Sequence, residues 1–158
     1  MIEHNPFFEA MKQAVSQTLE NMAFVEAMEH YDQNYELPAE DLVWTSMLIM
    51  DPVQGELHLA MSKTLLVKLT TAIFALDVDE VTEDQLHDSL DELLNTIGGL
   101  FMSNLLADNQ TYRLGLPEFG EGKLPAPEPN SVIWKLMTTD EDPLQIIATG
   151  APLVALKD

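Results

Sequence analysis

Glu92 and Asn95 stand three residues apart in the stretch LHDSLDELLNTIGG, residues 86–99. In an α-helix, with about 100° of rotation per residue, both side chains lie opposite an apolar stripe. The stripe contains Leu86, Leu90, Leu93, Leu94, Ile97 and Phe101, and the opposite face contains Asp88, Glu92, Asn95, Gly99 and Met102. A carboxylate can bind an ammonium group, and a carboxamide can both donate and accept hydrogen bonds to a bound water. The pair therefore predicts a polar site on the exposed side of a helix.

A Glu and an Asn at this spacing also occur on ordinary solvated helix faces, above all in a chain with 27 acidic residues. The neighbouring Gly98 and Gly99 weaken a helix by roughly 1 kcal/mol each relative to alanine. Two explanations for these glycines are open. They let the helix pack closely on a neighbouring element, or they leave room for a partner near the polar face.

The composition indicates one domain that spans residues 1–158, because 46% hydrophobic content in a chain of this length can build a single core. A formal net charge of −20 makes nucleic acid and anionic membrane surfaces poor partners and favours basic protein surfaces. The absence of cysteine excludes disulfides, thiolate metal sites and cysteine nucleophiles. The N-terminus is polar and no apolar run is long enough to span a bilayer, so we expect a cytoplasmic protein without a membrane partner.

The first half of the chain predicts a helix, a hairpin and a second helix. Asn5 and Pro6 are a typical helix start, and the apolar spacing predicts a helix that continues to about His30. This helix contains Met11, Met22 and Met28, which we expect in the core. Residues 42–50 and 55–61 have strand composition around a Pro- and Gly-containing turn, and the second strand predicts one buried face of Leu57, Leu59 and Met61 against Glu56, His58 and Ala60. Ser62 is placed to cap the following helix.

The second half begins with the helix that contains Glu92 and Asn95. Thr82 and Gln85 predict a capping box at its start. Strand composition returns at residues 111–116, 131–137 and 144–149, and the segment from Pro117 to Asn130 predicts a long Pro- and Gly-rich loop. Because helices and strands come in blocks, we expect an α+β fold with an antiparallel β-sheet and two long helices packed against it.

The two halves also indicate an internal repeat. Residues 17–27 can be aligned with residues 91–101, which places Asn21 on Asn95 and Thr18 on Glu92. The first helix would then lack the acidic member of the pair, and we assign no site role to Asn21.

Other groups of polar residues give weaker evidence for a functional site. His87 and Asp91 lie one helical turn apart but lack a third ligand at a recognisable spacing, so we predict no metal site. His4, His30 and His58 are scattered along the chain and we expect ordinary roles for them. The chain contains no nucleophile-elbow, P-loop or dinucleotide-binding motif.

The stretch DELLNTIGGLFMSNLL, followed by RLGLP and FGEG, resembles the CheC, CheX and FliY group of chemotaxis phosphatases, and CheX most closely. The resemblance implies dephosphorylation of a phosphorylated CheY-like response regulator. Glu92 would dock on the conserved lysine of the receiver domain, and Asn95 would orient the attacking water. Asp88 and Gly99 would belong to the docking face.

The same resemblance implies further properties. The Mg²⁺ would be supplied by the response regulator, so we expect no cofactor of the protein's own. A single site, without one in the first helix, is the CheX-like arrangement, and relatives of this type imply a homodimer. The alternatives are a non-catalytic receiver-binding or flagellar-switch interaction module on the same fold, and an unrelated acidic protein-binding domain.

Overall fold

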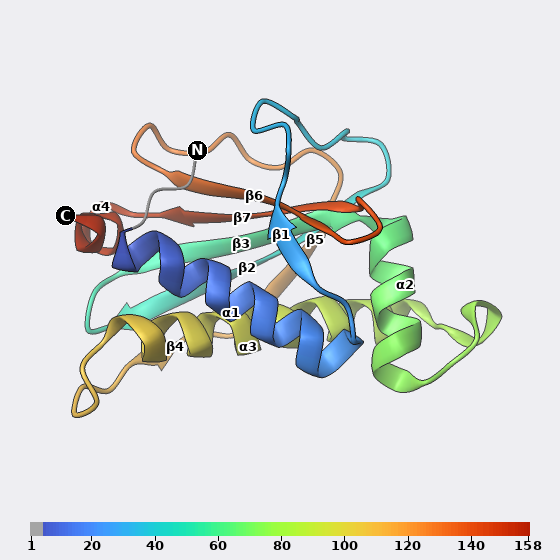
Figure 1. The fold of residues 1–158 in the computed structure, drawn as a ribbon, viewed down its shortest axis with the longest axis horizontal. Coiled ribbons are helices and arrows are strands. Elements are labelled where there is room, and N and C mark those ends of the chain that lie inside the picture. The colour runs from blue at the N-terminus through green and yellow to red at the C-terminus, as the bar shows by residue number, and fades with distance from the viewer. Residues whose placement is uncertain (1–4) are drawn as a thin grey trace.

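The computed structural model describes residues 5–158, and Figure 1 shows their arrangement. Over these residues the chain forms four α-helices and seven strands. The helices are α1 (Pro6–Ala23), α2 (Lys63–Phe74), α3 (Glu83–Leu105) and α4 (Ala151–Val154), with short 3₁₀ turns at Val78–Glu80 and Ala155–Lys157. The strands are β1 (Ala27–Glu29), β2 (Leu42–Asp51), β3 (Gly55–Ser62), β4 (Arg113–Leu114), β5 (Glu118–Glu121), β6 (Val132–Thr138) and β7 (Pro143–Thr149). None of these helices is both long enough and apolar enough to cross a lipid bilayer.

The strands form one antiparallel sheet in the order β1-β6-β7-β3-β2-β4, and β5 pairs with β2 as well. The long helices α1 and α3 lie on the same side of this sheet (Figure 1) and pack against each other. Helix α3 also contacts β2 and β3 directly. The expected α+β class, with two long helices on an antiparallel sheet, is confirmed. The internal repeat stays a prediction.

Several local signals act as the sequence predicts. The Asn5 side chain accepts a hydrogen bond from the backbone N–H of Phe7 at 2.8 Å, and Pro6 is the first residue of α1. Ser62 caps α2 through the N–H of Leu65 at 3.0 Å. Thr82 and Gln85 form the capping box that starts α3. Each cap satisfies backbone N–H groups that have no partner within the helix.

The first helix is shorter than predicted. It ends at Ala23, where Phe24 adopts a left-handed conformation with φ of 60°. The chain then turns into β1, which pairs with β6. The helical prediction to His30 is therefore wrong, because pairing with a distant strand outweighs local apolar spacing. Met28 is 42% exposed on β1 and is not a core residue. His30 is buried, and its Nδ1 accepts a hydrogen bond from the N–H of Asp32; His4 lies outside the described residues.

The predicted loop from Pro117 to Asn130 contains a strand. Its first part forms β5, which pairs with the free edge of β2 and places Gly120 opposite Trp44. Gly120 suits this position because an added Cβ would overlap the Trp44 ring. The later residues of the segment, Leu124 to Glu128, lie over the outer face of the sheet beside Trp44 and His58. Part of the outer face is therefore covered as well. Ala60, which the alternation predicts on the exposed side, is buried and lies between its register partners Trp44 and Gln145. Conversely, only Arg113 and Leu114 of the strand expected at residues 111–116 pair as β4.

Helix α3 is buried along a broad sector. The buried residues include the whole predicted stripe, which is Leu86, Leu90, Leu93, Leu94, Ile97 and Phe101. Met102 is fully buried too, although the periodicity places it on the polar face. The sector is wider than one stripe because α3 packs against α1 as well as the sheet.

The two glycines of α3 have different surroundings. A Cβ added to Gly98 would overlap the terminal methyl of Met47 on β2 and lie 3.5 Å from the Leu114 side chain. A Cβ added to Gly99 would meet the Tyr112 hydroxyl at 3.5 Å, which is ordinary contact. Close packing on a neighbouring element therefore accounts for Gly98, whereas packing places no such demand on Gly99.

This difference predicts opposite outcomes for two alanine substitutions that gain the same helix propensity. Relative to Gly99→Ala, we expect Gly98→Ala to lower the free energy of unfolding by about 1 kcal/mol, the lower end of the usual cost of overpacking a core, because the new methyl overlaps only the flexible end of the Met47 side chain. Gly99→Ala should match or exceed the stability of the unchanged protein, because alanine favours helix by about 1 kcal/mol. Urea unfolding of the two variants measures both. Equal stability of the two variants would contradict the packing assigned to Gly98.

Candidate functional site

Glu92 and Asn95 lie one turn apart on the exposed side of α3. Together with Asp88, Asp91, Leu116 and Pro117, they line a shallow hollow of about 340 Å³. The structure therefore brings three of the predicted site residues, Asp88, Glu92 and Asn95, to one place. Gly99, the fourth, is half-buried beside Tyr112 and is not part of the hollow's lining.

Both side chains of the pair are accessible to a partner. Oε1 of Glu92 accepts a long hydrogen bond, 3.3 Å, from the Thr96 hydroxyl within the same helix. This weak contact at an exposed position leaves most of the carboxylate available to an external cation. The carboxamide of Asn95 is also exposed and offers one acceptor and two donor positions to a ligand.

Asp91 connects the site to the sheet. Its Oδ1 accepts a hydrogen bond of 2.7 Å from the hydroxyl of Thr45, a fully buried residue of β2. This contact fixes the turn of α3 that precedes Asn95. The sequence held no local signal for it, because the two residues are 46 positions apart. Asp91 therefore serves to hold the helix on the sheet.

The opposite wall of the hollow is the short connection between β4 and β5. Leu114 packs near Gly98 of α3, and the N–H of Gly115 donates to the carbonyl of Leu48 at 2.8 Å. Leu116 and Pro117 then face the hollow before β5 begins. In the sequence, only the RLGLP motif of the family resemblance indicated that this segment belongs to the site.

The hollow is acidic. Asp88, Asp91 and Glu92 contribute three carboxylates, and its lining contains no lysine or arginine. In a protein with a net charge of −20, this local charge attracts cationic groups and repels anions. The site is therefore suited to a basic protein surface and cannot by itself bind a free phosphate well.

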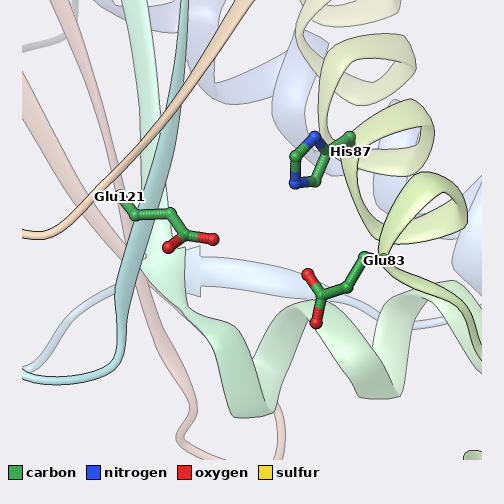
Figure 2. A group of neighbouring side chains, drawn as sticks. All are labelled: Glu83, His87 and Glu121. Carbon is green, nitrogen blue, oxygen red and sulfur yellow. The ribbon is translucent and has the colours of Figure 1, made fainter.

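A second group of side chains lies nearer the start of α3. Figure 2 shows Glu83 and His87 of α3 facing Glu121 of β5. One potential ligand atom of each lies within 4.8 Å of the others. The His87 ring stacks on Phe119, with ring centroids 3.7 Å apart. Asp91, which the sequence paired with His87, is not a member of the group.

A lysine already neutralises part of this group. The Lys63 ammonium lies 2.7 Å from Oε1 of Glu83, and this hydrogen bond is the main cause that raises the pKa of Lys63, with a smaller contribution from the charge of Glu121. A metal ion would have to displace that ammonium. The prediction that the chain holds no metal of its own therefore stays a prediction, although two carboxylates do accompany His87.

We expect added Zn²⁺ to leave the thermal unfolding temperature of the protein unchanged, because Lys63 competes for Glu83 and the group is exposed to solvent. The measurement compares the unchanged protein with His87→Ala, each with Zn²⁺ and with a chelator. An increase with Zn²⁺ that His87→Ala abolishes would contradict this expectation and show that His87 takes part in binding the ion.

Helix α1 offers no counterpart to the pair on α3. Thr18 is only 1% exposed, so the position aligned with Glu92 faces the core. Asn21 is exposed, but no acidic side chain stands one turn before it. Of the two long helices, α3 therefore has an exposed acid and an exposed Asn one turn apart, and α1 does not.

The model of a protein family described as chemotaxis phosphatase CheX matches residues 44–131, which is more than half of the chain and includes α3 and the hollow. The chain belongs to the CheX family. The resemblance inferred from the motif around Glu92 and Asn95 is thereby confirmed at the level of the family. A search of curated proteins finds no match.

Several solved structures share the fold. CheX from Desulfovibrio desulfuricans is 14% identical with a TM-score of 0.71, over 90% of this chain and 97% of that one. A chain in the CheX-CheY-BeF3-Mg²⁺ complex from Borrelia burgdorferi is 17% identical with a TM-score of 0.69, over 94% and 98%. FliY from Thermotoga maritima is 13% identical with a TM-score of 0.63, over 92% and 86%. At these identities the comparison establishes a common fold.

Proposed function

We propose that this protein is a phosphatase that hydrolyses the aspartyl-phosphate of a CheY-like response regulator. The observation that carries the proposal is the exposed Glu92–Asn95 pair on a helix whose other side is fully buried. Membership of a family described as chemotaxis phosphatase supports it. The similarity to a chain in a CheX-CheY complex supports the choice of partner.

Asn95 orients the attacking water. The water oxygen forms a bond to phosphorus, the bond from phosphorus to the aspartyl oxygen breaks, and the products are aspartate and inorganic phosphate. A carboxamide cannot act as a general base, but it can hold a water in line with the bond that breaks. Positioning and charge stabilisation supply most of the catalysis in phosphoryl transfer, so a neutral side chain is adequate.

Glu92 binds the receiver. Its carboxylate lies one turn from Asn95. When Glu92 binds an ammonium group of the receiver, this spacing fixes the position of the Asn95 carboxamide in the receiver's active site. The exposed carboxylate of Asp88 adds attraction for a basic surface around that site. Gly99 lies one turn beyond Asn95, and we retain for it the role of leaving room for the partner's backbone.

The chain needs no cofactor of its own for this reaction. The Mg²⁺ would belong to the receiver, and the CheX-CheY-BeF3-Mg²⁺ complex from Borrelia burgdorferi, which contains this ion, supports that assignment. A homodimer, a cytoplasmic location and the lack of nucleic-acid binding stay predictions from the sequence.

Asn95→Ala should abolish the acceleration of phosphate release, by at least about 100-fold, since a poorly positioned reactant costs about that much. Binding to the receiver should persist, because the carboxamide acts on the water. The measurement is phosphate release from a phosphorylated CheY-like receiver with Mg²⁺. The matched control is Asn21→Ala, which removes an exposed Asn from α1 and should leave the rate unchanged.

The non-catalytic alternative gives a different result in the same assay. A receiver-binding or flagellar-switch module would bind the receiver and leave its phosphate release unchanged. Acceleration by Asn95→Ala equal to that of the unchanged protein would remove the role assigned to the carboxamide.

Glu92→Gln should act on recognition. Loss of one docking charge should raise KM for the phosphorylated receiver by roughly tenfold, equivalent to about 1.4 kcal/mol, with a smaller effect on kcat. High salt should reduce the difference, because an exposed ion pair is screened. The control is Glu20→Gln, which makes the same change in net charge on the exposed side of α1. Equal KM values for the two variants would show that Glu92 has no special docking role.

A further inference from the structure

Leu116 is an apolar side chain left in solvent beside a polar site. It is 89% exposed, more than Phe24 at 78% or Val78 at 69%. A single exposed leucine is unremarkable on a protein surface. Leu116, however, lines the same hollow as Glu92 and Asn95. Its position, rather than its exposure alone, calls for an explanation.

The backbone presents this side chain in a fixed position. Leu114, two residues earlier, points toward α3, where it lies near Gly98. Gly115 is hydrogen-bonded to the carbonyl of Leu48, and β5 resumes the pairing with β2 directly after Pro117. Pro117 restricts its own φ angle, and the conformation of the residue before a proline is restricted as well. Leu116 therefore projects from a segment that is held on both sides, and little conformational freedom would be lost when a partner covers it.

The surroundings of Leu116 restrict the kind of partner. The exposed acids Asp88 and Glu92 lie across the hollow, and the exposed Glu118 follows two residues later in the chain. An apolar side chain with carboxylates around it fits a depression that is apolar at its centre and basic at its rim. An anionic partner surface would repel the carboxylates. A uniformly polar partner surface would give Leu116 no apolar contact.

We propose that Leu116 is a positioning residue for the response regulator, inserting into an apolar depression beside the receiver's active site. This rests on the proposed function, which makes a receiver domain the partner. Glu92 supplies the charged contact, Leu116 the apolar contact on the opposite wall, and Asn95 lies in the same hollow and enters the active site. Two contacts on different elements fix the orientation of the partner, which a single ion pair cannot do. Leu116 has no group that can act on the phosphate, so it affects binding and leaves the chemical step unchanged.

The test compares Leu116→Ala, Leu116→Met and Val78→Ala with the unchanged protein. Two quantities are measured for each: Kd for a CheY-like receiver charged with Mg²⁺ and beryllofluoride, and the kinetics of phosphate release. We expect Leu116→Ala to raise Kd and KM by roughly 10-fold or more, as for the loss of a buried leucine, with kcat nearly unchanged. Leu116→Met keeps an apolar side chain and should restore most of the affinity. Val78→Ala shortens another exposed aliphatic residue, which lies outside the hollow, and should have no effect.

The outcomes separate this inference from the proposed function. Acceleration by the unchanged protein, with the same Kd and KM for Leu116→Ala, would overturn the role of Leu116 and leave the phosphatase intact. Binding without acceleration would overturn the phosphatase, and the Kd values would still decide on Leu116. If the charged receiver does not bind at all, both proposals fail. Thermal unfolding verifies that Leu116→Ala is folded, which we expect because the side chain is almost fully exposed.

Discussion

The burial of one side of α3 is the constraint on which the rest of the structure depends. Leu90, Leu93, Ile97 and Phe101 have no exposed surface, and they pack the helix against both α1 and the sheet. Gly98 permits the close approach to Met47 at the crossing with β2. Because these contacts fix the rotation of α3 about its axis, the residues on its other side have fixed directions into solvent. Two exposed side chains on one helix can therefore keep a defined geometry in a shallow hollow.

The composition of the site matches a reaction that two proteins complete together. The described hollow contains carboxylates, one carboxamide and an apolar wall, and it lacks the paired nucleophile and base of a self-sufficient hydrolase. In the proposed reaction, the receiver supplies the phosphoryl group and the Mg²⁺. In that reaction this chain contributes three positioned side chains, which are the carboxylate of Glu92, the apolar side chain of Leu116 and the carboxamide of Asn95. Its net charge of −20 favours encounter with a basic protein surface.

The parts of the fold and site that could be predicted are those encoded by local patterns. Helical periodicity placed Glu92 and Asn95 outward, and the caps at Asn5, Ser62 and Thr82 follow from side chains within a few residues of the backbone groups they satisfy. Contacts between distant residues left no such signal. Strand β1 replaced the end of a predicted helix because it pairs with β6, more than 100 residues later, and β5 formed in a Gly- and Pro-rich segment because the edge of β2 was available. For the same reason the contact of Asp91 with Thr45, the approach of Glu121 to His87 and the place of Leu116 in the hollow required the structure.

In the proposed reaction Asn95 enters the active site of a phosphorylated receiver, and the resonance of its side-chain amide would report that contact. The measurement is a nitrogen-15 NMR titration with a CheY-like receiver, with and without Mg²⁺ and beryllofluoride, in which Asn95 and Asn21 are assigned. We expect a large shift of the Asn95 side-chain signal with the receiver that holds Mg²⁺ and beryllofluoride, and none for Asn21. Saturable binding of the charged receiver that leaves the Asn95 amide unchanged would contradict it.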